Sequence, residues 1–298
     1  MSSWVEILNA TSDAQNPILF LDSMRRSILN QISGYTNRNV ITYYSAWLTK
    51  PAEANLGITD ADKNAFMQAV YKLDKSRGLD LILHTPGGNI AAAESIVDYL
   101  HSIFCDNIRA IVPQMAMSAG TMIALSCPEI MMGKHSSLGP VDPQYQGLSC
   151  QESVDEFDEA VKAVSENPSS LGLWQVRIAK YTPTFLISCK NALAWSKSYT
   201  EKWLAHNYNL SEEAVASMAK PFVDHSESKS HSRQFSAAQC KTFGLNVSDL
   251  EADDAFQDLV LSLHHCYMIF FDKSTAFKAV ENQTGARYLR VNNMITAK

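Results

Sequence analysis

Two short apolar runs, separated by a helical pattern, organise the centre of the chain. Leu79–His84 is mostly apolar and stops at Thr-Pro-Gly-Gly, and Ile108–Pro113 leads into Met-Ala-Met-Ser-Ala-Gly. Apolar residues recur between the two runs at helical spacing, at Ile90, Ile96, Val97, Leu100 and Phe104. The pattern predicts strand, turn, helix, strand and turn, in that order, and both turns can expose backbone N–H groups.

The residues before this stretch also alternate between helical and extended patterns. Pro17 suits the first turn of a helix that Gly34 would end. Asn39–Leu48 is rich in β-branched and aromatic residues, which predicts a strand, and Thr59–Asp62 predicts the start of a helix after it. Strand, helix and strand in this order predict a parallel sheet with a right-handed crossover. Residues 1–16 are polar, and we expect them to be frayed or to form a short arm.

Helical patterns dominate the second half of the chain. Ala119–Ser126 predicts a short buried helix, Glu129–Met132 a strand, and Phe185–Tyr208 and Asp253–Asp272 two long helices. His225–Arg233 is polar and Ser-rich, which predicts a mobile loop. The expected organisation is an N-terminal helical arm at 1–38, an α/β domain at 39–272 with a helical insertion or lid at 148–232, and a C-terminal tail at 273–298.

The composition narrows the class of protein. Of the 298 residues, 46% are hydrophobic, and the net charge of -6 argues against a general binder of nucleic acids or anionic membranes. No apolar run approaches the roughly 18 residues of a membrane span, and the N-terminus lacks a signal-peptide pattern. The six cysteines have no Cys-x-x-Cys spacing, which favours reduced thiols and a cytoplasmic protein. We recognise no metal-ligand spacing and no cofactor motif.

The two turns carry the candidate chemistry. Carboxyl ends of neighbouring parallel strands meet at one edge of a sheet, so we expect Ser118 to lie beside Gly87-Gly88. A serine with small neighbours, close to a second set of exposed N–H groups, is the arrangement that acyl transfer needs. The alternatives are a serine that caps the following helix and an ordinary glycine turn. Neither a phosphate-binding loop nor the Gly-x-Ser-x-Gly elbow is present.

The order of these motifs resembles the ClpP/crotonase superfamily. Thr-Pro-Gly-Gly, a helix and then Ala-Met-Ser-Ala-Gly are most similar to its serine dehydrogenase proteinase (SDH) branch, which is related to signal peptide peptidase A. MGKHSSLGPVDPQ resembles the segment after the nucleophilic helix in the SDH group, and HSRQFSAAQCKTFGLNVSDLE a stretch of the signal peptide peptidase A group. The resemblance covers residues 40–270. It implies stacked β-β-α units with a helical C-terminal part, a homo-oligomer, and a serine nucleophile that works without ATP.

The resemblance also implies roles for single residues. By position, Ser118 is the nucleophile, and the oxyanion hole is formed by Gly87, Gly88 and Ala119. ClpP proteases place a histidine base after the nucleophilic helix, whereas residues 138–142 read Leu-Gly-Pro-Val-Asp here. The signal peptide peptidase A branch uses a lysine base in a low-polarity site, and Lys180 resembles that lysine. The alternatives are His135, Lys162 and Lys190, so a Ser-Lys dyad is favoured over a Ser-His-Asp triad.

Three functions remain open from the sequence. The first is a cytoplasmic serine endopeptidase that cleaves peptides or unfolded chains, with no nucleic-acid partner. The second is a crotonase-type enzyme that holds an acyl-thioester enolate in the same oxyanion hole, although neither an acidic acid/base residue nor a place for a nucleotide tail is found. The third is a catalytically silent oligomeric scaffold, which stays open because the general base is not fixed.

Overall fold

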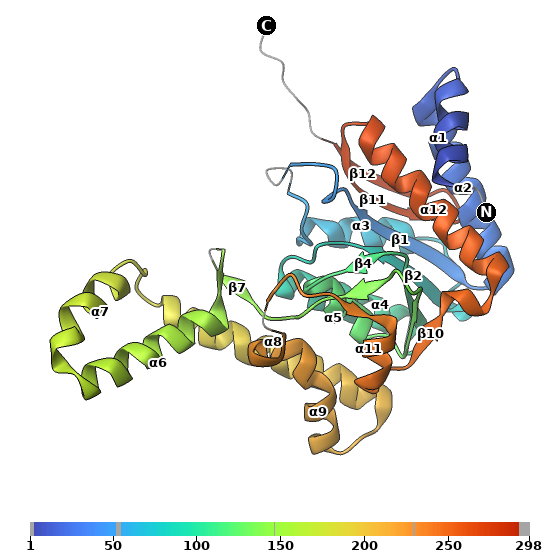
Figure 1. The fold of residues 1–298 in the computed structure, drawn as a ribbon. Helices are drawn as coiled ribbons and strands as arrows, with labels where there is room; N and C mark the ends of the chain where they lie inside the picture. The colour runs from blue at the N-terminus through green and yellow to red at the C-terminus, as the bar shows by residue number, and fades with distance from the viewer. Residues whose placement is uncertain (1–2, 52–54, 146, 229, 292–298) are drawn as a thin grey trace, which may run out of the picture. The chain divides into compact units, whose positions relative to one another are not determined.

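The fold is taken from a computed structural model, which describes residues 3–51, 55–145, 147–228 and 230–291. Its contacts divide the chain into two units. Unit 1 comprises the residues up to 138 and those from 234 onward, and unit 2 comprises residues 139–233. The predicted helical region 148–232 therefore falls within unit 2, whereas both motif-bearing turns belong to unit 1 (Figure 1).

The main sheet of unit 1, counted over the described residues, has seven strands in the order β10-β5-β3-β2-β1-β11-β12. Neighbouring strands from β10 to β1 pair in parallel, and β11 and β12 add antiparallel pairs (Figure 1). The strands are β1 (Asn39–Ser45), β2 (Leu79–His84), β3 (Ile108–Val112), β5 (Glu129–Met132), β10 (Val247–Asp249), β11 (Ala276–Asn282) and β12 (Arg287–Val291). This arrangement confirms the predicted α/β class with parallel strands.

Helices and short strands complete unit 1. The helices are α1 (Trp4–Asp13), α2 (Pro17–Thr36), α3 (Ala61–Val70), α4 (Ile90–Phe104), α5 (Ala119–Leu125), α11 (Ala237–Thr242) and α12 (Asp254–Lys273), with 3₁₀ turns at Lys75–Arg77 and Leu250–Ala252. A small sheet joins β4 (Met115–Ala116), β6 (Ser137–Leu138) and β9 (Phe235–Ser236). None of the helices in the described ranges has the length and apolarity needed to cross a membrane.

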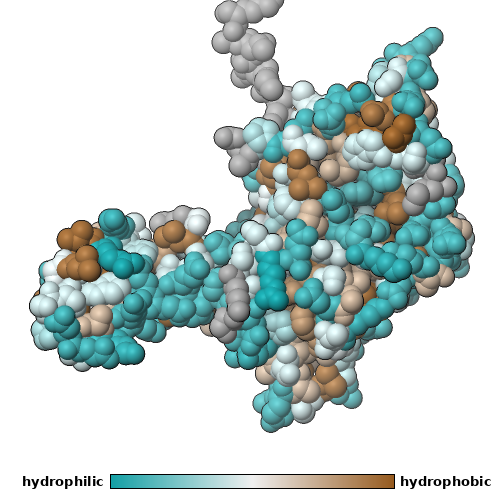
Figure 2. Space-filling view, in the orientation of Figure 1, coloured by the Kyte–Doolittle hydropathy of each residue, from teal (hydrophilic) through white to brown (hydrophobic). Residues whose placement is uncertain are grey.

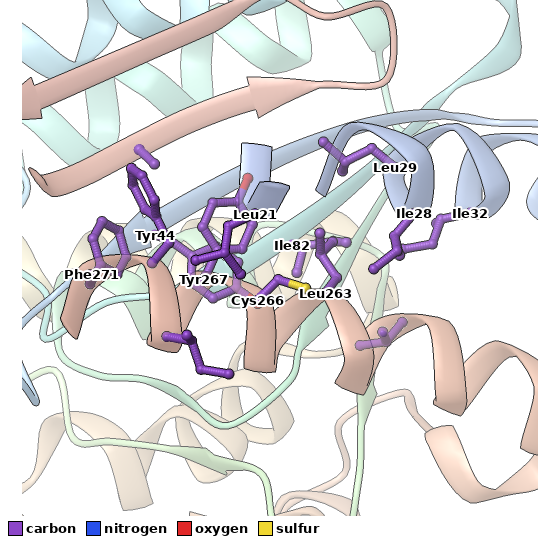
Figure 3. Close-up of a cluster of buried hydrophobic side chains, with 14 of the residues drawn as sticks. Leu21, Ile28, Leu29, Ile32, Tyr44, Ile82, Leu263, Cys266, Tyr267 and Phe271 are labelled. Carbon is purple, nitrogen blue, oxygen red and sulfur yellow. The ribbon is translucent and has the colours of Figure 1, made fainter. Parts of the chain in front are cut away.

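A large hydrophobic cluster joins α2 and α12 to the sheet. Figure 3 shows Leu21 of α2 near Tyr44 of β1 and Tyr267 of α12, and Ile82 of β2 beside Leu263 of α12. The rings of Tyr44 and Tyr267 stack with centroids 4.0 Å apart. Every residue of β2 is buried, as expected for a parallel strand that is covered on both faces. This packing fixes the strand whose carboxyl end carries Thr-Pro-Gly-Gly.

The two ends of the chain differ from the sequence-based expectation. Residues 1–16, expected to be frayed or a short arm, contain the helix α1. A capping box of Ser3 and Glu6 starts this helix, so the segment is not frayed there. Helix α2 continues two residues past Gly34, and Asn37 takes the left-handed conformation that ends it, with φ 52°. Residues 273–298 were expected to be a tail, but β11 and β12 extend the main sheet from there. Residues 292–298 lie outside the described part.

Unit 2 is helical. It contains α6 (Cys150–Glu166), α7 (Leu171–Ile178), α8 (Phe185–Tyr208), α9 (Glu212–Val223) and α10 (His225–Ser228), a 3₁₀ turn at Pro168–Ser170, and a hairpin of β7 (Gln144–Tyr145) and β8 (Leu148–Ser149). The bounds predicted for α8 are confirmed. Cys150, Phe185 and Cys189 form a small buried cluster. Figure 2 shows apolar side chains on the surface of α7, where Leu173 and Val176 are exposed.

Candidate active site

The two turns of the candidate site meet at the carboxyl edge of β2 and β3. These strands pair in parallel from Leu79↔Ile108 to Ile82↔Ile111. The pairing continues beyond them, because the Thr85 N–H donates to the Met115 carbonyl (3.1 Å) and the Met117 N–H to the Thr85 carbonyl (3.0 Å). The main chain therefore joins the turn after β2 to the residue that precedes Ser118.

Gly87 lies in direct contact with the Ser118 turn. A Cβ added at Gly87 would lie 2.6 Å from the Ser118 Cβ and 2.9 Å from the Ala119 nitrogen. The φ of Gly87 is 95°, a conformation that side-chain-bearing residues rarely adopt. Both observations require glycine here. They place the turn at Gly87 and Gly88, called the glycine turn below, against the candidate nucleophile.

Ser118 has an unusual backbone conformation and is partly exposed. Its φ of 51° and ψ of -119° are unusual for a residue other than glycine. The Ser118 hydroxyl makes no capping bond to α5, so the helix-cap alternative is not what the structure has. Ser118 is partly exposed, whereas all seven residues of α5 are buried. Ser118 is thus a partly exposed residue at the start of a buried helix.

The three residues expected at the oxyanion hole differ in their hydrogen bonds. The Gly87 N–H already donates to the Thr85 Oγ1, at 3.2 Å. Within the described residues, the N–H groups of Gly88 and Ala119 have no acceptor. Gly88 and Ala119 can therefore offer their N–H groups to a ligand, and Gly87 is needed for the shape of the turn.

A third segment, which contains Ile58, completes the edge. The Ile58 N–H donates to the Gly87 carbonyl (2.7 Å), and the Asn89 N–H donates to the Ile58 carbonyl (2.9 Å). Ile58 and Gly88 form a parallel bridge, and a Cβ added at Gly88 would lie 2.2 Å from the Ile58 nitrogen. The glycine turn is therefore held between Ile58 on one side and Ser118 on the other.

The candidate bases are divided between the two units. His135 belongs to unit 1, but it is exposed and its ring covers Gly133, where an added Cβ would lie 2.5 Å from the His135 Cε1. Lys180 belongs to unit 2 and is exposed in the turn after α7, where it lines a pocket of about 330 Å³ with Glu156 and Arg177. Lys162 on α6 and Lys190 on α8 are also exposed residues of unit 2.

Two polar groups that the sequence analysis missed are prominent in the structure. Burial lowers the pKa of Lys278 in β11, although Asp62 opposes this change. In unit 2, the buried Asp142 accepts hydrogen bonds from the Nδ1 atoms of His225 (3.2 Å) and His231 (2.8 Å). The hydrogen bond to Asp142 raises the pKa of His231, whereas burial lowers it. The cluster of histidines in His225–Arg233 was the signal for this site in the sequence.

Comparisons with known proteins find one protein family and several curated relatives that match parts of the chain. The family model for the ClpP-like SDH-type serine proteinases matches residues 17–167, which include both turns. An uncharacterized protein of Methanocaldococcus jannaschii is 36% identical over 148 residues, which are 46% of this chain and 49% of the relative. A second uncharacterized protein of that organism is 40% identical over 87 residues, 29% of this chain and 30% of the relative.

A more distant relative has a named activity. The ATP-dependent Clp protease proteolytic subunit of Streptococcus pyogenes is 37% identical over 79 residues, which are 26% of this chain and 38% of that subunit. The chain thus spans about half the length, or less, of the curated relatives cited here.

Proposed function

The chain belongs to the ClpP-like SDH-type serine proteinase family, and we propose that it is an endopeptidase with Ser118 as its nucleophile. One observation carries the proposal. Ser118 is partly exposed, its hydroxyl makes no capping bond, and its turn touches Gly87. The N–H groups of Gly88 and Ala119 are the donors proposed for the oxyanion. Peptides and unfolded chains are the proposed substrates, because the family model that the chain matches describes serine proteinases.

The proposed reaction is an acyl transfer in two steps. The Ser118 oxygen attacks the peptide carbonyl while a base takes the hydroxyl proton, and the carbonyl oxygen becomes an oxyanion. The N–H groups of Gly88 and Ala119 stabilise this charge, and one such donor contributes about 10²–10³-fold in kcat. The intermediate then releases the amine, which takes a proton from the protonated base, and leaves an acyl-serine. Water hydrolyses this ester in the second step and restores the hydroxyl.

The base is proposed from the resemblance. We propose Lys180 as the partner of Ser118 in a Ser-Lys dyad, with His135, Lys162 and Lys190 as the alternatives. Peptide cleavage by Lys180→Ala and His135→Ala tests the assignment, with each variant's melting temperature as the control for folding. Loss of cleavage in Lys180→Ala alone supports the dyad, and full activity in that variant excludes it. The same assay on His231→Ala asks whether the imidazole held by Asp142 serves instead.

The compartment and the oligomeric state of the enzyme are also proposals. All six cysteines have free thiols, which supports the cytoplasm as the compartment. A homo-oligomer is proposed from the ClpP-like family, and light scattering at micromolar concentration tests it. The alternatives from the sequence analysis, a crotonase-type acyl-thioester enzyme and a silent scaffold, share the fold and the N–H donors. They differ from a peptidase in making no covalent use of Ser118.

A fluorophosphonate probe tests the nucleophile, because it labels activated serines covalently. We expect the wild type to be labelled, Ser118→Ala to lose the label, and Ser126→Ala at the other end of α5 to keep it. A wild-type protein that takes no label would refute the proposed nucleophile and favour the scaffold or the thioester enzyme. Full labelling of Ser118→Ala would place the reactive serine elsewhere.

A further inference from the structure

A buried ion pair lies behind the segment that holds the glycine turn. The side chains of Lys278 in β11 and Asp62 in α3 are each 2% exposed, and the Lys278 amine donates to Asp62 Oδ2 at 2.8 Å. The same amine also donates to the backbone carbonyl of Gly57. Lys278 therefore ties the main chain beside the glycine turn to the antiparallel part of the main sheet.

Asp62 gathers further donors around the same segment. Its Oδ2 accepts the Thr59 N–H at 2.8 Å and the Tyr43 hydroxyl at 3.0 Å. Tyr43 is part of β1, so the carboxylate connects Thr59 to the centre of the sheet. Gly57 and Thr59 are thus anchored by one charge pair, and Ile58 lies between them.

Ile58 contacts the glycine turn through its main chain alone, and these contacts connect the turn to the ion pair. It forms a bridge with Gly88, accepts a hydrogen bond from Asn89 and donates one to Gly87. Gly57 is equally close, since a Cβ added there would lie 3.3 Å from both the Gly87 oxygen and the Gly88 Cα. The contacts of Gly57 and Ile58 with the glycine turn involve no flexible side chain, so a shift of either residue would move Gly88.

We propose that Lys278 and Asp62 are positioning residues, which hold Gly57–Thr59 so that the Gly88 N–H faces the oxyanion formed at Ser118. The proposal rests on the peptidase function proposed above. A buried ion pair is weak evidence of a contribution to stability, because apolar side chains of similar volume often stabilise a core as well. An amine that binds a carboxylate and a carbonyl together fixes the direction of the backbone, which an apolar side chain does not.

Hydrogen exchange tests the positioning without any need for activity. The test variant is Lys278→Met/Asp62→Asn, which removes both charges of the pair together. The control is Arg25→Met/Glu281→Gln, which removes another buried pair, joined at 3.1 Å, that also involves β11. We expect exchange of the Ile58 and Asn89 amides to rise about tenfold in the test variant, equivalent to about 1.4 kcal/mol of local opening free energy, and to stay unchanged in the control.

Kinetics then test the consequence for the reaction. We expect kcat for peptide cleavage to fall by about 10–100-fold in the test variant, because a misplacement of about 1 Å can cost a factor near 10². KM should change little, since the oxyanion exists only in the transition state and the intermediate. The control pair should keep the wild-type kcat, because its side chains bind Asp22 and Tyr267 rather than Gly57.

A second variant covers the case in which the double substitution does not fold. Gly57→Ala leaves the ion pair intact and presses a methyl group on the glycine turn, so it should lower kcat in the same way. Unchanged exchange at Ile58 and Asn89 in the folded double variant, or an unchanged kcat in Gly57→Ala, would overturn the proposal. If exchange rises as expected while the wild type neither cleaves peptides nor takes the probe, the positioning stands and the peptidase proposal fails.

Discussion

Two parts of the molecule hold their polar groups in different ways. The turns of the candidate site in unit 1 are held by main-chain hydrogen bonds, such as those of Thr85 with Met115 and Met117. The Asp142 cluster in unit 2 is held by side chains, since the rings of His225 and His231 both bind one buried carboxylate. Backbone amides and carbonyls do not titrate near neutral pH, whereas histidines do.

We expect this difference to determine how the site turns and the histidine cluster respond to a change of volume or of pH. The site turns have almost no free space, so an added methyl group should disturb them more than a change of pH. The histidine cluster includes one ring that is 35% exposed, so it should respond to pH more than to small changes of volume. The predictions below test this contrast, beginning with the largest expected effect.

The largest effect is expected from Gly87→Ala. The new methyl group would lie 2.6 Å from the Ser118 Cβ, and alanine at a φ of 95° adds backbone strain of about 1–3 kcal/mol. We expect the rate of fluorophosphonate labelling to fall by about 100-fold or more, as in other cases where reacting atoms are misplaced by about 1 Å. Labelling kinetics and urea denaturation measure the two effects separately.

Gly285→Ala is the matched control for Gly87→Ala. Gly285 has a φ of 94°, and a Cβ added there would meet only the flexible end of Arg26, at 3.3 Å. It should therefore show the loss of stability without the loss of labelling. If both variants lose labelling to the same extent, the close contact with Ser118 is not what matters, and the contrast between the two regions is lost.

A smaller effect is expected from Thr85→Val. Valine keeps the methyl group that packs on Gly120 but removes the acceptor of the Gly87 N–H. A buried donor without a partner costs about 1–3 kcal/mol. We expect kcat to fall by about tenfold, or about 1.4 kcal/mol, as the glycine turn relaxes. Thr85→Ser restores the acceptor, so it should recover most of kcat, and a serine variant as slow as valine would assign the effect to packing.

The same contrast explains what the sequence could reveal. The run from Leu79 to Gly120 was predictable because apolar periodicity, paired glycines and small residues are local signals. The pairing of Ile58 with Gly88 gave no such signal, because main-chain hydrogen bonds leave no pattern in the side chains. The sequence pattern did not predict the strand β11, because Lys278 and Glu281 interrupt its apolar residues. They are buried through partners 216 and 256 residues away, Asp62 and Arg25, which periodicity cannot identify.

The smallest effect is expected from the titration of His231. The hydrogen bond to Asp142 raises the pKa of His231 above its ordinary value of 6.5, so the folded state favours the protonated ring. The stability that this interaction contributes is therefore fully present below about pH 6.5 and is lost as the pH rises through the raised pKa. Partial exposure of the ring makes the contribution small.

Exchange measurements in unit 2 can detect this loss. Hydrogen exchange of peptides that cover Asp142 and residues 225–228, corrected for the intrinsic rate, should show weaker protection at about pH 9 than at about pH 6. The site turns around Gly88 should show no such change, because main-chain bonds hold them. His231→Gln should remove the pH dependence in unit 2. If the dependence persists in that variant, the hydrogen bond between His231 and Asp142 is not its cause.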